Sequence, residues 1–308
     1  RGLGDVYKRQ MLFLNSNVRV ESSSTIGPNA ESVFVYPSVD LAWQFSKLDL
    51  FVGSPILTFG KFRLAYGEVG VEPPPYNTQS IYVSPNYSDS YGGSLSTDLF
   101  GAGSFTPSQD LGDPNLRPEI KREYEVGTDI RFFDNKVKIG YSYYYNTTDD
   151  VFFNLSLANS SGYDELFTNA GKIENKGMEV DFSYDIIQND DFNVNINANW
   201  SYYRNKVLDL KGVESIRLGG LSAVSGRAVE GYPLGVFWGT KFTRSDDGSI
   251  ILNDNGFPSL APENGVIGDP HPDWQGGIGT TVTWKDLNLY FLFESYQGAD
   301  IYAGTKAV

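Results

Sequence analysis

The segment 190–202 alternates strictly between apolar and polar side chains. Its apolar positions are Phe192, Val194, Ile196, Ala198, Trp200 and Tyr202, and the positions between them are Asp191, Asn193, Asn195, Asn197, Asn199 and Ser201. A period of two places successive side chains on opposite faces of a β-strand. Asn has a poor intrinsic preference for strands, so the surroundings must stabilise this one. A wall between hydrocarbon and water does so, and the segment predicts a strand of a transmembrane β-barrel.

The same two-residue period recurs along the chain, and no helical pattern of comparable length interrupts it. The further alternating segments are 12–20, 39–45, 62–66, 124–132, 137–145, 178–184 and 274–293. Several are longer than the roughly 5–6 residues of a typical globular strand. We therefore predict an all-β fold. A soluble β-sandwich, β-helix or jelly roll is the alternative, because half-buried strands alternate in those folds too.

Short and long connections alternate between the predicted strands. Tight turns are expected at Asp134–Asn135, Gln188–Asp190 and Lys285–Asp286. Long loops are expected at 21–31, 71–118, 146–168 and 206–230. Short periplasmic turns at one rim and long extracellular loops at the other are typical of outer-membrane barrels.

Threading the chain in this way sorts its aromatic residues into two groups. Trp43, Phe45, Phe132 and Trp284 fall near the short-turn rim, whereas Tyr143, Tyr145, Trp200 and Tyr202 fall near the long-loop rim. Amphipathic rings gather at the two interfaces of a membrane, so two aromatic belts are expected.

Composition narrows the possible functions. The chain has 308 residues, a formal net charge of −14, no Cys and a single His. An acidic balance disfavours nucleic-acid binding, and a chain without Cys has no disulfide, thiol nucleophile or thiolate metal site. No apolar run approaches the roughly 18 residues of a spanning helix, so a membrane span must consist of strands. Residues 1–10 lack a signal-peptide pattern and are expected to be a non-native leader, with the partial barrel domain covering 11–308.

Several motifs carry a family resemblance. The passage D-P-N-L-R-P-E-I-K-R-E-Y-E-V-G (113–127) resembles a motif of TonB-dependent outer-membrane receptors, and N-A-G-K-I-E-N-K-G-M-E-V (169–180) resembles another. The SusC/RagA branch is the more similar one. Its hallmarks resemble segments 34–46, 62–70, 230–239, 267–277 and 296–306.

This resemblance implies a fold and a function. It implies part of a large antiparallel transmembrane β-barrel in the bacterial outer membrane, incomplete and without the plug domain. The activity implied is TonB-dependent import of large nutrients, a glycan first and a peptide second, with no enzymatic activity and no cofactor. The implied partners are a SusD-like lipoprotein, TonB (through the N-terminal part) and outer-membrane lipid. The alternatives are a siderophore or vitamin receptor without a SusD-like lid, and a soluble surface glycan-binding β-protein.

Candidate ligand contacts are aromatic residues in the predicted loops or at the rim. Aromatic rings above a pore can stack on sugar faces or pack on nonpolar peptide side chains. The alternative is that they pack on one another and order the loops. The candidates are Tyr76, Tyr82, Tyr87, Tyr91, Tyr163, Tyr232 and Trp238.

Other polar features favour structural explanations. The stretch 243–256 resembles a calcium loop but lacks the first carboxylate ligand, so we expect a solvated turn and no metal site. The pairs Asp149/Asp150, Asp190/Asp191 and Asp246/Asp247 are expected to be solvated turn residues rather than catalytic acids, and no catalytic residue is assigned. His271 is expected to be a loop residue. The Asn residues of 193–199 are expected to face the lumen, where they line a polar channel or contact the plug.

Overall fold

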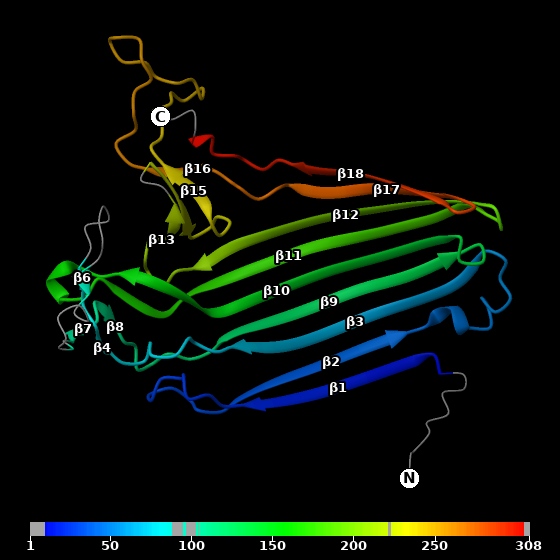
Figure 1. The fold of residues 1–308 in the computed structure, drawn as a ribbon, viewed down its shortest axis with the longest axis horizontal. Coiled ribbons are helices and arrows are strands. Elements are labelled where there is room, and N and C mark those ends of the chain that lie inside the picture. Colours follow the sequence, from blue (N-terminus) through cyan, green and yellow to red (C-terminus); the bar gives the residue numbers. More distant parts are fainter. Residues whose placement is uncertain (1–9, 88–94, 97–102, 104, 221–222, 305–308) are drawn as a thin grey trace.

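The computed structural model describes residues 10–87, 95–96, 103, 105–220 and 223–304. Long antiparallel strands form one curved sheet, in which β1 and β18 lie at opposite edges (Figure 1). In spatial order the strands are β1 (Leu12–Glu21), β2 (Phe34–Trp43), β3 (Leu57–Val71), β9 (Glu119–Phe132), β10 (Val137–Ser156), β11 (Glu165–Gln188), β12 (Phe192–Asp209), β17 (Trp274–Trp284) and β18 (Leu287–Gln297). The prediction of an all-β, open piece of a large antiparallel barrel is confirmed.

Shorter elements gather at one end of the sheet, on the left of Figure 1. A small sheet contains β13 (Ser215–Gly220), β14 (Val224–Val229), β15 (Val236–Gly239) and β16 (Gly265–Gly268). The remaining short strands are β4 (Tyr82–Val83), β5 (Asn86–Tyr87), β6 (Leu95–Ser96), β7 (Thr106–Pro107) and β8 (Asp110–Leu111). In the described residues, the 3-10 turn η3 (Asn159–Ser161) follows β10 at this end, whereas η1 (Phe45–Lys47) lies in the β2–β3 connection at the opposite end of the sheet. No helix in the described ranges is long and apolar enough to cross a membrane.

The two ends of the sheet differ as the connection lengths predicted. The turns between β9 and β10, β11 and β12, and β17 and β18 lie together at one end, which we call the short-turn rim. The long connections lie at the other end, the long-loop rim (Figure 1). The prediction of a long loop at 146–168 is wrong, because β10 extends to Ser156 and β11 begins at Glu165. Most of that stretch is paired strand that continues beyond the alternating segments.

Strand pairing separates an outer apolar face from an inner polar face. Tyr143 lies opposite Met178, which lies opposite Tyr202, and the rings of Tyr66 and Tyr124 are 4.8 Å apart. We call the outward tyrosine and tryptophan residues at this level the upper aromatic rung; they are Tyr66, Tyr124, Tyr143, Tyr145, Trp200 and Tyr202. At the short-turn rim, Trp284 pairs with Phe192 and Leu287. The predicted division into two aromatic belts is confirmed for these pairs.

The Asn ladder of β12 lies against glycine residues of β17. Asn197 is paired with Gly279, and Asn199 with Gly277. A side-chain carbon on Gly279 would lie 2.7 Å from Oδ1 of Asn197, so glycine leaves the space that the amide occupies. Asn195 instead donates hydrogen bonds to Ser183 and Asp185 of β11. These neighbours explain how a strand rich in Asn is stabilised.

A small hydrophobic core joins the sheet to β13 and β14 at the long-loop rim. Its buried members are Val151, Phe153, Ala170, Ile173, Val207, Leu210, Ile216 and Ala228. At Gly171 the ring of Phe153 approaches the backbone closely, because a side-chain carbon there would lie 2.5 Å from that ring. This core therefore fixes the ends of β10, β11 and β12 where the loops depart.

Candidate functional site at the long-loop rim

Residues 113–119, the D-P-N-L-R-P-E segment, form the centre of the site. Leu116 and Pro118 are fully buried, which holds the segment against the wall. Two of its carbonyl groups accept backbone hydrogen bonds from the β1–β2 loop: that of Leu116 from Gly27 at 2.7 Å, and that of Pro114 from Asn29 at 3.0 Å. The segment therefore joins two loops that are far apart in the sequence.

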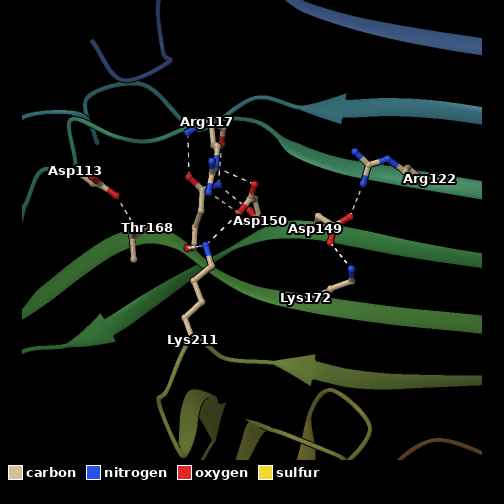
Figure 2. Close-up of polar contacts among 9 residues, drawn as sticks. Asp113, Arg117, Arg122, Asp149, Asp150, Thr168, Lys172 and Lys211 are labelled. Carbon is tan, nitrogen blue, oxygen red and sulfur yellow. Dashed lines mark hydrogen bonds and ion pairs between the residues drawn. The ribbon is translucent and has the colours of Figure 1, made fainter. Parts of the chain in front are cut away.

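The charged residues of the segment bind the next two strands. Figure 2 shows Asp113 beside Thr168, whose hydroxyl donates to Oδ2 of Asp113 at 2.5 Å. The guanidinium of Arg117 contacts both carboxylate oxygens of Asp150, at 2.8 and 3.1 Å. Asp150 lies at an irregularity of β10 with a positive φ of 58°, a conformation that Asp tolerates better than most residues. The irregularity turns its carboxylate toward Arg117.

Asn169 and Lys211 complete this group of contacts, which we call the rim clasp. Figure 2 shows Lys211 reaching toward Asp150. Asn169 is 7% exposed; its amide donates to the carbonyl groups of Arg117 and Asp150, and its Oδ1 accepts the N–H of Arg117. Lys211 follows β12, and its ammonium contacts Asp150 at 3.1 Å and the carbonyl of Asn169 at 2.7 Å. The rim clasp is therefore Asp113, Arg117, Asp150, Thr168, Asn169 and Lys211.

Glu119 closes the segment on the loop side of Tyr124, outside the band between the aromatic belts. Its carboxylate accepts the backbone N–H of Phe152 at 2.6 Å. Burial raises the pKa of the Glu119 carboxyl, and the hydrogen bond from Phe152 opposes that rise. The residue thus supplies an acceptor for a strand N–H at the point where the pairing of β10 is irregular.

Asp149 belongs to a separate group of ion pairs. It contacts Arg122 at 2.6 Å and Lys172 at 2.8 Å, as Figure 2 shows. The prediction that Asp149 and Asp150 are solvated turn residues is therefore wrong, since both lie within β10 and form ion pairs with their side chains mostly covered. For Asp190/Asp191 and Asp246/Asp247 the prediction is confirmed, because they lie in exposed turns.

A cavity of about 710 Å³ lies beside the rim clasp. Amide, charged and aromatic side chains line it, among them Asn29, Phe34, Asn115, Arg117, Asp150 and Lys211. Asp150 contacts Nε and Nη2 of Arg117 and the ammonium of Lys211, so one carboxylate holds both cations within the clasp. The arrangement is suited to holding loops in position rather than to proton transfer.

The predicted aromatic ligand contacts lie in several separate places. Tyr76 and Tyr82 are 73% and 72% exposed in the β3–β9 connection. Tyr163 is half-buried beside η3, and Tyr232 is exposed in the turn after β14. The guanidinium carbon of Arg227 lies 5.2 Å from the ring centre of Trp238 on β15. Tyr87 belongs to β5, and Tyr91 falls outside the described residues.

His271 and the stretch 243–256 lie in a loop and in turns, as predicted from the sequence. His271 is in a loop, with Nδ1 2.8 Å from Oδ1 of Asp269 and its ring edge-on to Tyr203. The stretch 243–256 forms bridged turns, in which Arg244 pairs with Ile250. The hydroxyl of Ser245 holds the pKa of the Asp247 carboxyl below its usual range. Within the described ranges, no three His, Asp or Glu side chains are grouped to hold a metal ion.

Comparison with known proteins decides the family. The sequence model of the family described as "TonB dependent receptor-like, beta-barrel" matches residues 10–305. The chain belongs to the TonB-dependent receptor β-barrel family. This is a family of transporters and receptors rather than enzymes.

Three proteins that are similar to this receptor barrel show which members of the family it resembles. TonB-dependent receptor P26 of Formosa agariphila is 28% identical over 308 residues, which covers 92% of this chain and 30% of the relative. TonB-dependent receptor SusC of Bacteroides thetaiotaomicron is 23% identical over 58% of this chain and 17% of its own length. The solved structure of the RagAB peptide transporter superposes with a TM-score of 0.73 at 22% identity, covering 92% of this chain and 31% of that one. The receptor barrel thus spans about a third of P26, and its wall has the fold of the RagAB chain.

Proposed function

We propose that this chain supplies wall and loops to a SusC-like importer in the bacterial outer membrane, and that the imported nutrient is an oligosaccharide. The observation that carries the proposal is the two-faced wall. Its outer face bears the two aromatic belts, whereas its inner face bears the Asn ladder over Gly277 and Gly279. Neutral amides donate and accept hydrogen bonds, as the hydroxyl groups of sugars require. Membership of the family supports the barrel, and the SusC relative supports this branch.

The proposed partners follow from the same relatives. A SusD-like lipoprotein would cover the long-loop rim and deliver the cargo, and TonB would energise import through parts of the receptor outside this chain. Tyr76 and Tyr82 are the proposed ligand contacts in this arrangement, because both rings are largely exposed in a loop above the wall. Tyr87, Tyr91, Tyr163, Tyr232 and Trp238 stay predictions of the same kind.

Peptide import is the second candidate, and one feature of the inner face favours it. A cavity of about 290 Å³ opens on β11, β12, β17 and β18. Glu179, Asp181 and Glu294 line it together with Asn199 and Gln275. Three carboxylates among amides fit a basic peptide better than a neutral sugar. RagAB, whose wall has the same fold, is itself a peptide transporter.

Uptake by the full-length receptor tests the proposal. A strain lacking the gene should lose uptake of a fluorescent oligosaccharide, and an uncoupler should abolish uptake in the parent strain, because import consumes the proton-motive force. The SusD-like lipoprotein should co-purify with the receptor. Loss of labelled-peptide uptake with normal oligosaccharide uptake would move the assignment to the second candidate. Loss of iron-chelate uptake alone would refute both.

The tyrosine contacts need a separate measurement. Tyr76→Ala/Tyr82→Ala should weaken cargo binding about 10-fold, because each stacked ring contributes roughly 0.5–1.5 kcal/mol. Tyr76→Phe/Tyr82→Phe, which keeps both rings, should bind like the unaltered receptor. Binding that is unchanged in the alanine pair would show that these rings serve the loop and not the ligand.

A further inference from the structure

Lys176, Arg204 and Lys206 form a cluster of cations on the outer face of β11 and β12, which we call the basic patch. Lys176 lies directly opposite Arg204, and Lys206 lies opposite Glu174. The chain as a whole is acidic, with 38 Asp and Glu residues against 24 Lys and Arg. A group of cations on one face of such a chain is therefore a local feature, distinct from its general charge.

The cations of the basic patch are incompletely neutralised. Like charges directly opposite each other on antiparallel strands are destabilising, so the Lys176–Arg204 pair opposes the pairing of β11 with β12. Arg204 is compensated by the carboxylate of Asp273. Lys176, however, is 3.9 Å from Glu174, the limit of an ion pair, and Lys206 has no ion pair within the described part of the chain. Both lysines are exposed.

The height of the basic patch on the wall indicates what it faces. From Phe192 to Tyr202 the strand advances ~33 Å, or ~23 Å along the barrel axis at a tilt of about 45°, which matches the apolar band of an outer-membrane barrel. Lys206 lies a further ~9 Å along the axis by the same geometry. That is the depth of lipid headgroups beyond the hydrocarbon core.

The contacts of Arg204 link the patch to the upper aromatic rung. Its guanidinium carbon lies 5.0 Å from the centre of the Tyr202 ring, and that ring stacks on Trp200 at 6.4 Å. Along the outer face of β12, the side chains therefore change from apolar residues to aromatic rings and then to cations. Membrane lipids have the same order of layers, with acyl chains, an interface and headgroups, and anionic headgroups attract clustered Lys and Arg.

We propose that the basic patch binds the phosphate groups of a membrane lipid in the leaflet that meets the long-loop rim. The ammonium groups of Lys176 and Lys206 supply point charges to the phosphate oxygens, and Arg204 holds the edge of the site against Tyr202. Bound phosphate also removes the repulsion between Lys176 and Arg204. The lipid thereby stabilises the pairing of β11 with β12 at the point where the wall leaves the membrane.

Lipid binding by the full-length receptor in detergent, followed by native mass spectrometry, tests this site. The probes are diphosphoryl lipid A and diacylglycerol, which lacks phosphate. Lys176→Gln/Lys206→Gln should bind diphosphoryl lipid A about 25-fold more weakly, since each surface cation contributes roughly fivefold. Its binding of diacylglycerol should not change. Lys176→Arg/Lys206→Arg should bind both lipids as the unaltered receptor does.

The matched control changes two lysines on the inner face. Lys61 pairs with Asp129 and Lys121 with Glu123, so Lys61→Gln/Lys121→Gln removes the same charge from the side that meets no lipid. Equal affinity of all variants for diphosphoryl lipid A would overturn the proposal, as would an equal loss in the control. The site rests on the proposed outer-membrane setting but not on the cargo. A receptor that imports nutrients without charge-dependent lipid binding refutes the lipid site alone, and the reverse result refutes the import assignment alone.

Discussion

The wall and the rim clasp are stabilised in different ways. Between the two aromatic belts, a position needs only to be apolar on the outer face or polar on the inner face. The backbone hydrogen bonds between strands supply the remaining stability. In the clasp each side chain has particular partners, as Asn169 does in Arg117 and Asp150. The wall should therefore tolerate many substitutions that keep the class of side chain, whereas the clasp should be sensitive to small changes.

A charge on the outer face should damage the wall most. Ile196 lies near the middle of β12, between Phe192 and the upper aromatic rung. Ile196→Arg should destabilise the barrel by about 2–4 kcal/mol, because the guanidinium would face hydrocarbon at the membrane midplane. Denaturant titration of the full-length receptor in lipid vesicles measures the loss. Heat-modifiable electrophoretic mobility shows whether the variant still assembles.

The adjacent inner position is the control for this effect. Asn197→Arg places the same side chain one residue further along, facing the lumen beside Gly279. It should cost less than about 1 kcal/mol, because the side chain stays in water. Equal losses in the two variants would show that both flanks of β12 have the same surroundings, and the two-faced wall would be refuted.

Removing one amide should open the clasp without unfolding the wall. Asn169→Ala leaves the N–H of Arg117 and the carbonyl groups of Arg117 and Asp150 without their side-chain partner. A buried backbone group without a partner costs about 1–3 kcal/mol, so local opening of segment 113–119 should become roughly 5- to 160-fold more frequent. Hydrogen exchange at the Arg117 amide reports this opening.

A wall residue of the same type gives the comparison. Asn195 also donates two hydrogen bonds, to Ser183 and Asp185, but its side chain lies on the open inner face, where water can replace them. Asn195→Ala should leave exchange along β12 nearly unchanged. Similar exchange rates in the two variants would show that the clasp is no more specific than the wall.

The contrast also explains what the sequence alone could predict. The alternation of apolar and polar residues predicted the strand segments between the two aromatic belts, because each side chain there faces either hydrocarbon or the lumen. It failed for 146–168, which lies on the loop side of the upper aromatic rung, where Val151 and Phe153 of β10 pack into the small core instead of facing hydrocarbon. There, backbone pairing and the small core around Val151 and Phe153 continue the strands.

The rim clasp was missed for a different reason. The segment 113–119 and the residues from Asn169 onward were both recognised as motifs, but their contact joins positions 52 apart in the sequence. Asp150 was misassigned because adjacent acidic residues usually mark a turn. Only the irregularity of β10 brings its carboxylate to Arg117 and Lys211. A pattern of residue types does not encode such an irregularity.

Filling the space beside the Asn ladder should lower the stability of the barrel less than the charge at position 196 does. Gly279→Val forces the Asn197 amide away from its position, since even a first side-chain carbon would lie 2.7 Å from its Oδ1. An off-rotamer side chain costs about 0.5–1.5 kcal/mol, and a similar loss of stability is expected in vesicles. Thr281→Val on the same face of β17 should be nearly silent. A stabilised Gly279→Val variant would show that the glycine is not there to make room for the ladder.

The exposed turn at Asp247 should show the smallest effect, because it belongs to neither region. The hydroxyl of Ser245 and the N–H of Ser249 stabilise the carboxylate and lower its pKa. A lowered pKa in the folded state means that this contribution is present above the usual Asp pKa and is lost as the pH falls through the lowered value. Ser245→Ala should move the Asp247 pKa back toward its usual range, as followed by NMR of selectively labelled Asp, while hydrogen exchange at Arg117 stays unchanged. A coupled change at Arg117 would mean that the turn and the clasp open together, and the division of the rim into independent parts would then be wrong.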